Sequence, residues 1–145
     1  MAPFSRPSYE QYLYSLPEHN PAIRSSSLRL FTIGRNVGML RGSLWFTTDI
    51  ELRIQELLDL TDGEILEYSY TVFFRGERIR WYDPQPHPEN EDLRSTFPHH
   101  RHEPPDIKHN RRPAPGISFR VPNLPTLIDD CIALGATMIP GEADN

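Results

Sequence analysis

The prolines of this 145-residue chain leave one long gap, and that gap limits where a β-sheet can form. Residues 1–21 hold four of the fifteen prolines and residues 84–125 hold ten, whereas residues 22–83 hold none. A proline has no backbone N–H and therefore removes a hydrogen bond from a central strand. We predict that the main part of the sheet lies within residues 22–83.

Hydrophobic spacing assigns elements within this frame. Alternating and β-branched runs predict strands over residues 28–33, 39–46 and 50–60 and a last strand over 116–121. Two further strands are predicted between the turn at 61–63 and Asp83, and the turn at 75–76 separates them. Helical spacing predicts a short helix over residues 9–16 with Ser8 as its N-cap. It also predicts an amphipathic helix over 124–134, with Pro125 in its first turn and Gly135 at its end.

The predicted fold is a single α+β domain over residues 1–145. It is mainly an antiparallel sheet of about five or six strands, with a short N-terminal helix and a C-terminal helix packed on it. Residues 1–21 form the first helix and a proline-rich lead-in, residues 84–115 a proline- and histidine-rich loop, and residues 140–145 a flexible tail.

Two turns set the predicted register of the hairpins. A three-residue loop at 61–63 pairs Glu56 with Tyr68, whereas a two-residue Asp-Gly turn would shift every pair by one and give a poorer core. A two-residue turn at 75–76 then pairs Tyr68 with Asp83. Glu56, Tyr68 and Asp83 are thus predicted to form one row across the sheet.

Composition excludes several classes of protein. No apolar run approaches the roughly 18 residues of a membrane helix, and the N-terminus lacks the apolar stretch of a signal peptide, so we expect a cytoplasmic protein. The single cysteine, Cys131, excludes a disulfide framework. A formal net charge of −5 argues against attraction of nucleic acid over the whole surface.

Positive charge is concentrated in one segment. Between residues 94 and 112, five basic residues and four histidines accompany only two acidic residues. One interpretation is a local basic face, and the other is an ordinary solvated loop.

Short motifs in the second half of the chain resemble those of one protein family. Tyr82 and Asp83 end a predicted strand, His100-Arg101-His102 follows them, and Tyr68-Ser69-Tyr70 lies upstream. In this order and spacing, over about residues 50–134, the chain resembles the TumE family of toxins from bacterial type II toxin-antitoxin systems. The family pattern continues Tyr-Asp with Asn, but Pro84 stands there, so any role of that amide is lost or passes to another residue.

The resemblance implies a toxin that acts on RNA and is neutralised by a protein antitoxin, which we expect to carry a helix-turn-helix. It implies a catalytic core of Asp83, His100 and His102, supported by Tyr82 and Glu56. The residues predicted to bind substrate are Arg80, Arg101, His87, His99 and Tyr68.

The residue types fit that chemistry. Histidines at i and i+2 of an extended segment point the same way, and imidazole titrates near neutral pH. Such a pair beside Asp83 can move protons to and from a ribose hydroxyl or a phosphate, with an arginine stabilising negative charge. Glu56 interrupts the apolar phase of its strand, so it must be paired with Tyr68, an arginine or the site itself.

Three alternatives stay open. In the first, the histidines only hydrogen-bond the proline-broken backbone. In the second, Asp83 and the histidines bind a divalent metal, although the predicted chemistry needs no cofactor. In the third, the domain is a non-catalytic module that holds a protein or a nucleic acid with an exposed sheet edge and the basic loop. Catalysis requires Asp83, His100 and His102 to converge within hydrogen-bond distance, and a binding module does not.

Overall fold

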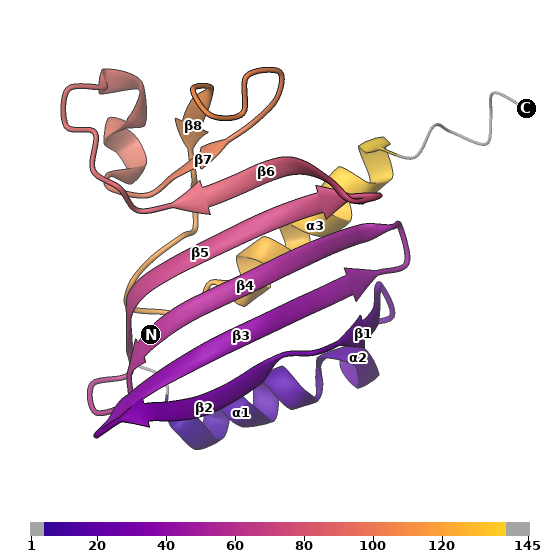
Figure 1. Cartoon of the computed structure of the whole chain (residues 1–145), viewed down its shortest axis with the longest axis vertical. Helices are drawn as coiled ribbons and strands as arrows, with labels where there is room; N and C mark the ends of the chain where they lie inside the picture. Colours follow the sequence, from indigo (N-terminus) through magenta and orange to yellow (C-terminus); the bar gives the residue numbers. More distant parts are fainter. Residues whose placement is uncertain (1–4, 139–145) are drawn as a thin grey trace, which may run out of the picture.

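An antiparallel sheet of eight strands organises the computed structural model, which describes residues 5–138 (Figure 1). The strands are β1 (Ile23–Ser26), β2 (Arg29–Gly34), β3 (Val37–Phe46), β4 (Ile50–Asp59), β5 (Glu64–Phe74), β6 (Glu77–Asp83), β7 (His100–His102) and β8 (Arg111–Pro113). Their order is β1, β3, β4, β5, β6, β7, β8, with β2 also paired to β3. The helices are α1 (Arg6–Tyr14), α2 (Leu16–His19), α3 (Leu124–Met138) and the short 3-10 helix η1 (Glu91–Thr96). The predicted α+β single domain is confirmed.

The sheet has more strands than the five or six predicted from the sequence. Two of the additional strands, β7 and β8, lie within residues 84–115, for which the sequence predicted only a loop. Pro113 is tolerated because it ends β8 at the edge of the sheet, where no further strand needs its missing N–H. Residues 116–121, predicted as a strand, form an irregular segment instead, in which the Phe119 carbonyl accepts a hydrogen bond from the Ile65 N–H at 2.7 Å.

The edge beside β3 consists of two short strands because the chain bends between them. Gly42 of β3 has a φ of +139°, and a Cβ there would lie 2.5 Å from the Ser27 carbonyl oxygen. Glycine therefore permits the close approach that separates β1 from β2.

Both long helices differ from their predicted ends. Ser5, rather than Ser8, is the N-cap of α1, and Ser8 completes a capping box with it. α3 continues past Gly135, which was predicted to end it. This glycine is needed for packing, because a Cβ at that position would clash with the side chain of Thr48. The predicted tail at residues 140–145 lies outside the described residues.

The hairpin of β4 and β5 has the predicted register over most of its length, with Glu56 opposite Tyr68. A bulge near the turn shifts the last pairs, so Leu58 faces Ile65 and Leu66 is 48% exposed.

The predicted register of β5 and β6 is wrong beyond a bulge at Ile79. Tyr82 lies opposite Tyr70, one residue out of the predicted phase. Neighbouring residues of a strand point to opposite faces, so Asp83 points away from the face that carries Tyr70 and Tyr68. The predicted row of three side chains therefore does not form.

The two faces of the sheet have different surroundings. The inner face carries the buried core and is covered by α1 and α3; α3 runs behind β4 and β5 in Figure 1. The outer face carries exposed or half-buried side chains such as Arg53, Gln55 and Trp81, and no α-helix within residues 5–138 covers it. None of the described helices combines the length and hydropathy that crossing a membrane requires.

Candidate functional site: an aspartate between two histidines

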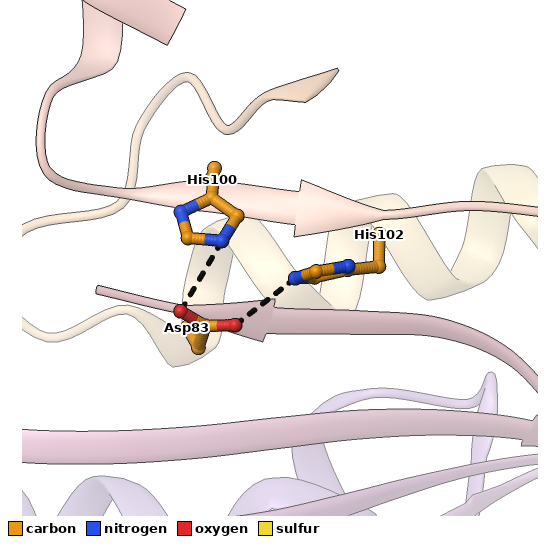
Figure 2. Close-up of side chains that lie close together, drawn as sticks. All are labelled: Asp83, His100 and His102. Carbon is orange, nitrogen blue, oxygen red and sulfur yellow. Dashed lines mark hydrogen bonds and ion pairs between the residues drawn. The ribbon is translucent and has the colours of Figure 1, made fainter. Parts of the chain in front are cut away.

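Two neighbouring strands bring three of the predicted residues together on the outer face. Asp83 ends β6, and His100 and His102 begin and end β7. The strands pair with Asp83 opposite His100 and Trp81 opposite His102. Because residues two apart on a strand share a face, the two imidazoles and the carboxylate converge (Figure 2).

Each imidazole places its Nε2 atom against a different oxygen of the same carboxylate. His100 Nε2 lies 3.2 Å from Asp83 Oδ1, and His102 Nε2 lies 3.1 Å from Asp83 Oδ2. The second contact has hydrogen-bond geometry, whereas His100 Nε2 has no hydrogen-bond partner among the described residues. The histidine side chains are 1% and 3% exposed and that of Asp83 is 15% exposed. The cluster meets the distance requirement for proton transfer, and these are also the residues that could hold a metal.

Main-chain carbonyls face the other nitrogen of each ring. His102 Nδ1 lies 2.8 Å from the Ile107 carbonyl oxygen, and His100 Nδ1 lies 3.3 Å from that of Pro98. A neutral imidazole has one N–H, so each ring can donate either to its carbonyl from Nδ1 or to Asp83 from Nε2, but not to both.

Burial and charge act on the pKa values of the cluster in opposite directions. Burial alone would raise the pKa of Asp83, but interactions with His100, with the Gln85 backbone N–H and with His102 outweigh it and lower that pKa. Burial, together with the charge of His100, lowers the pKa of His102, although the Asp83 carboxylate and the Ile107 carbonyl oppose this. The site therefore favours an ionised carboxylate beside a neutral imidazole of His102.

Aromatic rings enclose the two histidines. The Trp81 ring stacks on His102 with centroids 4.1 Å apart, and the His87 ring lies edge-on to His100 at 5.0 Å. Trp81 and Asp83 also line an open groove of about 610 Å³, which Pro84 and its neighbours border. Asp83 is thus the member of the cluster that borders a space large enough for a ligand.

Tyr82, Arg80 and Arg101 are held in another network, next to α3. Tyr82 donates a hydrogen bond to Asp130 Oδ2 of α3 at 2.7 Å. Arg80 and Arg101 both contact Glu103 Oε1, at 2.8 and 3.1 Å. The structure therefore does not bring these three predicted residues to Asp83, and both arginines are already paired with a carboxylate.

Glu56 is buried in the core under α1, away from the cluster. Its two carboxylate oxygens accept hydrogen bonds from the hydroxyls of Tyr9 at 2.6 Å and Tyr70 at 2.5 Å. The prediction that Glu56 must be paired is confirmed, but its partners are Tyr9 and Tyr70 rather than Tyr68, whose hydroxyl contacts His99. Burial raises the pKa of Glu56, although the two tyrosine hydrogen bonds partly oppose this.

Tyr68 and His99 form a separate core contact. The Tyr68 hydroxyl lies 2.7 Å from His99 Nδ1, and the two rings stack on each other and contact the Phe119 ring at a tilt. Burial raises the pKa of Tyr68 and lowers that of His99. His87 is the one residue of the predicted substrate-binding set whose ring touches the cluster.

Three polar residues with a structural role were not predicted. Asp130 binds Tyr82, Glu103 pairs with the arginines, and Asn123 donates to the Tyr70 hydroxyl at 3.0 Å. Only Glu103 had a sequence signal, since it follows the histidine pair directly and is one of two acidic residues in a basic segment.

Together the fold and the cluster define a class: a small α+β protein with a sheet covered on one face and a histidine-carboxylate site on the other. A family model described as Toxin TumE matches residues 13–134, and the chain belongs to this toxin family. The match includes Asp83, His100 and His102, and membership implies an antitoxin partner. No curated protein and no solved structure is detectably similar to the chain.

Proposed function

We propose that the chain is a toxin that cleaves RNA, with Asp83, His100 and His102 as its chemical centre. The observation that carries this proposal is the position of the Asp83 carboxylate on the wall of the groove, with two imidazole Nε2 atoms behind it. A carboxylate that borders a groove can contact a substrate while buried rings control its protons.

The chemistry is acid-base catalysis. Asp83 takes the proton of a ribose 2′-hydroxyl, and the Nε2 lone pair of a neighbouring histidine receives it. The 2′-oxygen attacks the adjacent phosphorus, the bond from phosphorus to the 5′-oxygen breaks, and the leaving oxygen takes the proton that the imidazole returns through the Asp83 carboxylate. The products are a 2′,3′-cyclic phosphate end and a 5′-hydroxyl end, and no proton is consumed.

The remaining predicted residues contribute in other ways. Glu56 and Tyr82 are positioning residues, because they hold α1 and α3 against the sheet that carries Asp83. His87 supports the His100 ring.

The rival interpretation, a non-catalytic module with a basic binding loop, has less support. Within residues 94–112, Arg101 and Arg112 lie 3.1 and 4.0 Å from Glu103 oxygens, and Arg94 lies 3.7 Å from Glu91. These carboxylates neutralise part of the positive charge on which the basic face would depend, although Glu103 is shared among Arg80, Arg101 and Arg112.

The proposal includes the antitoxin. A helix-turn-helix protein that covers the groove beside Asp83 would keep the toxin inactive in the cytoplasm. Release of the antitoxin would then expose the carboxylate to RNA.

The test compares Asp83→Asn with Asp106→Asn under induced expression in a bacterial host. Asp106 is the matched control, because its carboxylate also lies 3.1 Å from a histidine ring, that of His109, but the pair is exposed. We expect wild type and Asp106→Asn to arrest growth and to produce RNA fragments with 5′-hydroxyl ends, and Asp83→Asn to do neither. Circular dichroism checks that each variant folds. Arrest and cleavage by folded Asp83→Asn would overturn the proposal.

A further inference from the structure

We infer that Asp83, His100 and His102 form a binding site for one divalent transition-metal cation. The ligand atoms are the two imidazole Nε2 atoms and the Asp83 carboxylate, all within 4.8 Å of one another. This inference goes beyond RNA cleavage and does not depend on it.

The His100 and His102 rings have too few N–H protons for the acceptors around them. Each of the two rings faces a hydrogen-bond acceptor on both sides: a main-chain carbonyl at Nδ1 and an Asp83 oxygen at Nε2. A neutral imidazole has one N–H, so two neutral rings satisfy only half of these acceptors, whichever tautomer they adopt. Protonating both rings would bury two positive charges beside one carboxylate, which is costly.

A cation removes this conflict. It accepts the lone pairs of both Nε2 atoms and one of the carboxylate while each Nδ1–H keeps its carbonyl. His100 Nε2, which is buried and has no hydrogen-bond partner among the described residues, gains one as a ligand atom. Buried polar atoms rarely stay unpaired without a functional reason.

The distances fit a metal centre. Ligand atoms bound at about 2.0 Å in a tetrahedral site lie about 3.3 Å from each other. The two histidine nitrogens lie 3.2 and 3.1 Å from different oxygens of the carboxylate, and one ligand atom from each residue lies within 4.8 Å of the others. The side chains must draw together to centre a cation among them.

The surroundings are those of a supported ligand set. Histidine ligands usually donate their second N–H to a carbonyl or a carboxylate, which orients the ring. His102 does so to Ile107 and His100 to Pro98, and the Gln85 N–H donates to Asp83 Oδ1 at 2.8 Å. The stacked Trp81 ring keeps the His102 ring in place and keeps water from one side.

The donor set indicates the class of cation. Imidazole nitrogens suit Zn²⁺, Co²⁺, Ni²⁺ or Fe²⁺, whereas Mg²⁺ and Ca²⁺ prefer oxygen ligands. Two histidines and one carboxylate leave at least one coordination position open, and Asp83 borders the groove from which a further ligand would come. A cation on both Nε2 atoms takes the lone pairs that accept a proton in the proposed cleavage. Acid-base cleavage therefore belongs to the metal-free form, and the cation competes with it.

The experiment measures cation binding directly. The tag-free full chain is stripped with a chelator and titrated with Zn²⁺ by calorimetry and with Co²⁺ by visible absorption. We expect one cation per chain, with affinity about tenfold or more weaker in Asp83→Asn and in His102→Gln, since even the loss of a residue that only supports a ligand weakens sites this much. Asp106→Asn is the matched control and should bind like wild type. Equal affinity in wild type and Asp83→Asn, or no binding by wild type, would overturn the inference.

A second measurement needs no variant and therefore does not depend on the folding of one. Nitrogen NMR of the histidine rings in wild type should show that Zn²⁺ shifts the Nε2 resonances of two histidines and leaves their Nδ1–H signals in place. A shift of any other pair of nitrogens would contradict the site. Growth arrest without cation binding would reject this inference and leave the toxin proposal intact, and cation binding by a chain whose metal-free form cleaves no RNA would do the reverse.

Discussion

Two carboxylates of this protein, the buried Glu56 and the half-buried Asp83, each lie between two partners, and the partners differ in one respect. Glu56, on the inner face, accepts hydrogen bonds from two tyrosine hydroxyls. Asp83, on the outer face, faces two imidazole nitrogens whose rings direct their other nitrogen at carbonyls. Glu56 has a donor on each oxygen, whereas each neutral imidazole beside Asp83 has a single N–H and cannot donate to both the carboxylate and its carbonyl.

The difference separates a structural carboxylate from a functional one. A fully satisfied buried network rigidifies the fold, and here it ties α1 to the middle of the sheet. A network short of protons stabilises little by itself, but it is ready to take up a proton or a cation. We therefore expect the Glu56 cluster to determine stability and the Asp83 cluster to determine activity.

The largest expected effect is that of Glu56→Ala on stability. The substitution leaves a cavity and two buried tyrosine hydroxyls without their acceptor, so the free energy of unfolding should fall by about 3 kcal/mol or more. Urea unfolding measures it. Gln55→Ala is the control, because Gln55 is the next residue on β4 and is exposed, and it should change stability by less than about 0.5 kcal/mol. A loss below about 1 kcal/mol for Glu56→Ala would show that the network is not structural.

A smaller loss is expected from Tyr70→Phe, which removes one hydroxyl and keeps the ring. Glu56 Oε2 loses a charge-assisted donor, and Asn123 loses its acceptor. Hydrogen bonds to charged groups contribute about 1.5 to 3 kcal/mol, so unfolding free energy should fall by about 2 kcal/mol. If thermal and urea unfolding both find Tyr70→Phe as stable as wild type, the hydroxyl contributes nothing to stability. The Glu56 network on the inner face could then not be called structural.

Alternating residues made much of the sheet predictable from the sequence. The apolar phase of residues 50–58 and a glycine turn gave the correct register for Glu56 and Tyr68. Glu56 stood out as a polar residue in an apolar phase, which correctly predicted a paired, buried carboxylate. The pairing of Asp83 with two histidines was also anticipated in part, since His100 and His102 share a face on any extended segment.

What could not be predicted depends on bulges and on distant contacts. The bulge at Ile79 has no glycine or proline to mark it, yet it moves Asp83 to the outer face and Tyr82 to the inner face. β7 and β8 are only three residues long, too short for a periodic pattern. Asp130 lies 48 positions from its partner Tyr82, and no local rule connects them.

The pH dependence of stability in wild type and Glu56→Gln tests whether burial raises the pKa of Glu56. The folded-state pKa of Glu56 is raised by burial above its unfolded value of about 4.3, so between those values the folded protein binds the proton more tightly. The stability that this proton contributes is fully present below the unfolded pKa and is lost as pH rises through the folded pKa. Glutamine cannot titrate, so the unfolding free energy of Glu56→Gln minus that of wild type should increase over this pH range and then level off. A difference that stays constant or decreases with pH in urea titrations would contradict a raised pKa.

The smallest expected effect on stability is that of Asp83→Asn, although the same substitution should abolish toxicity. Asparagine keeps the shape of the side chain, and its NH₂ group can donate to the lone pair of one histidine Nε2, which removes one of the two mismatches. The lowered pKa of Asp83 means that its charge contributes some stability near neutral pH, which asparagine lacks, so the free energy of unfolding should fall by about 1 kcal/mol or less. Urea unfolding of Asp83→Asn beside Glu56→Gln measures the contrast directly. A loss of about 2 kcal/mol or more in Asp83→Asn would mean that both carboxylates are structural, and Asp83 could then no longer be distinguished from Glu56 as the functional one.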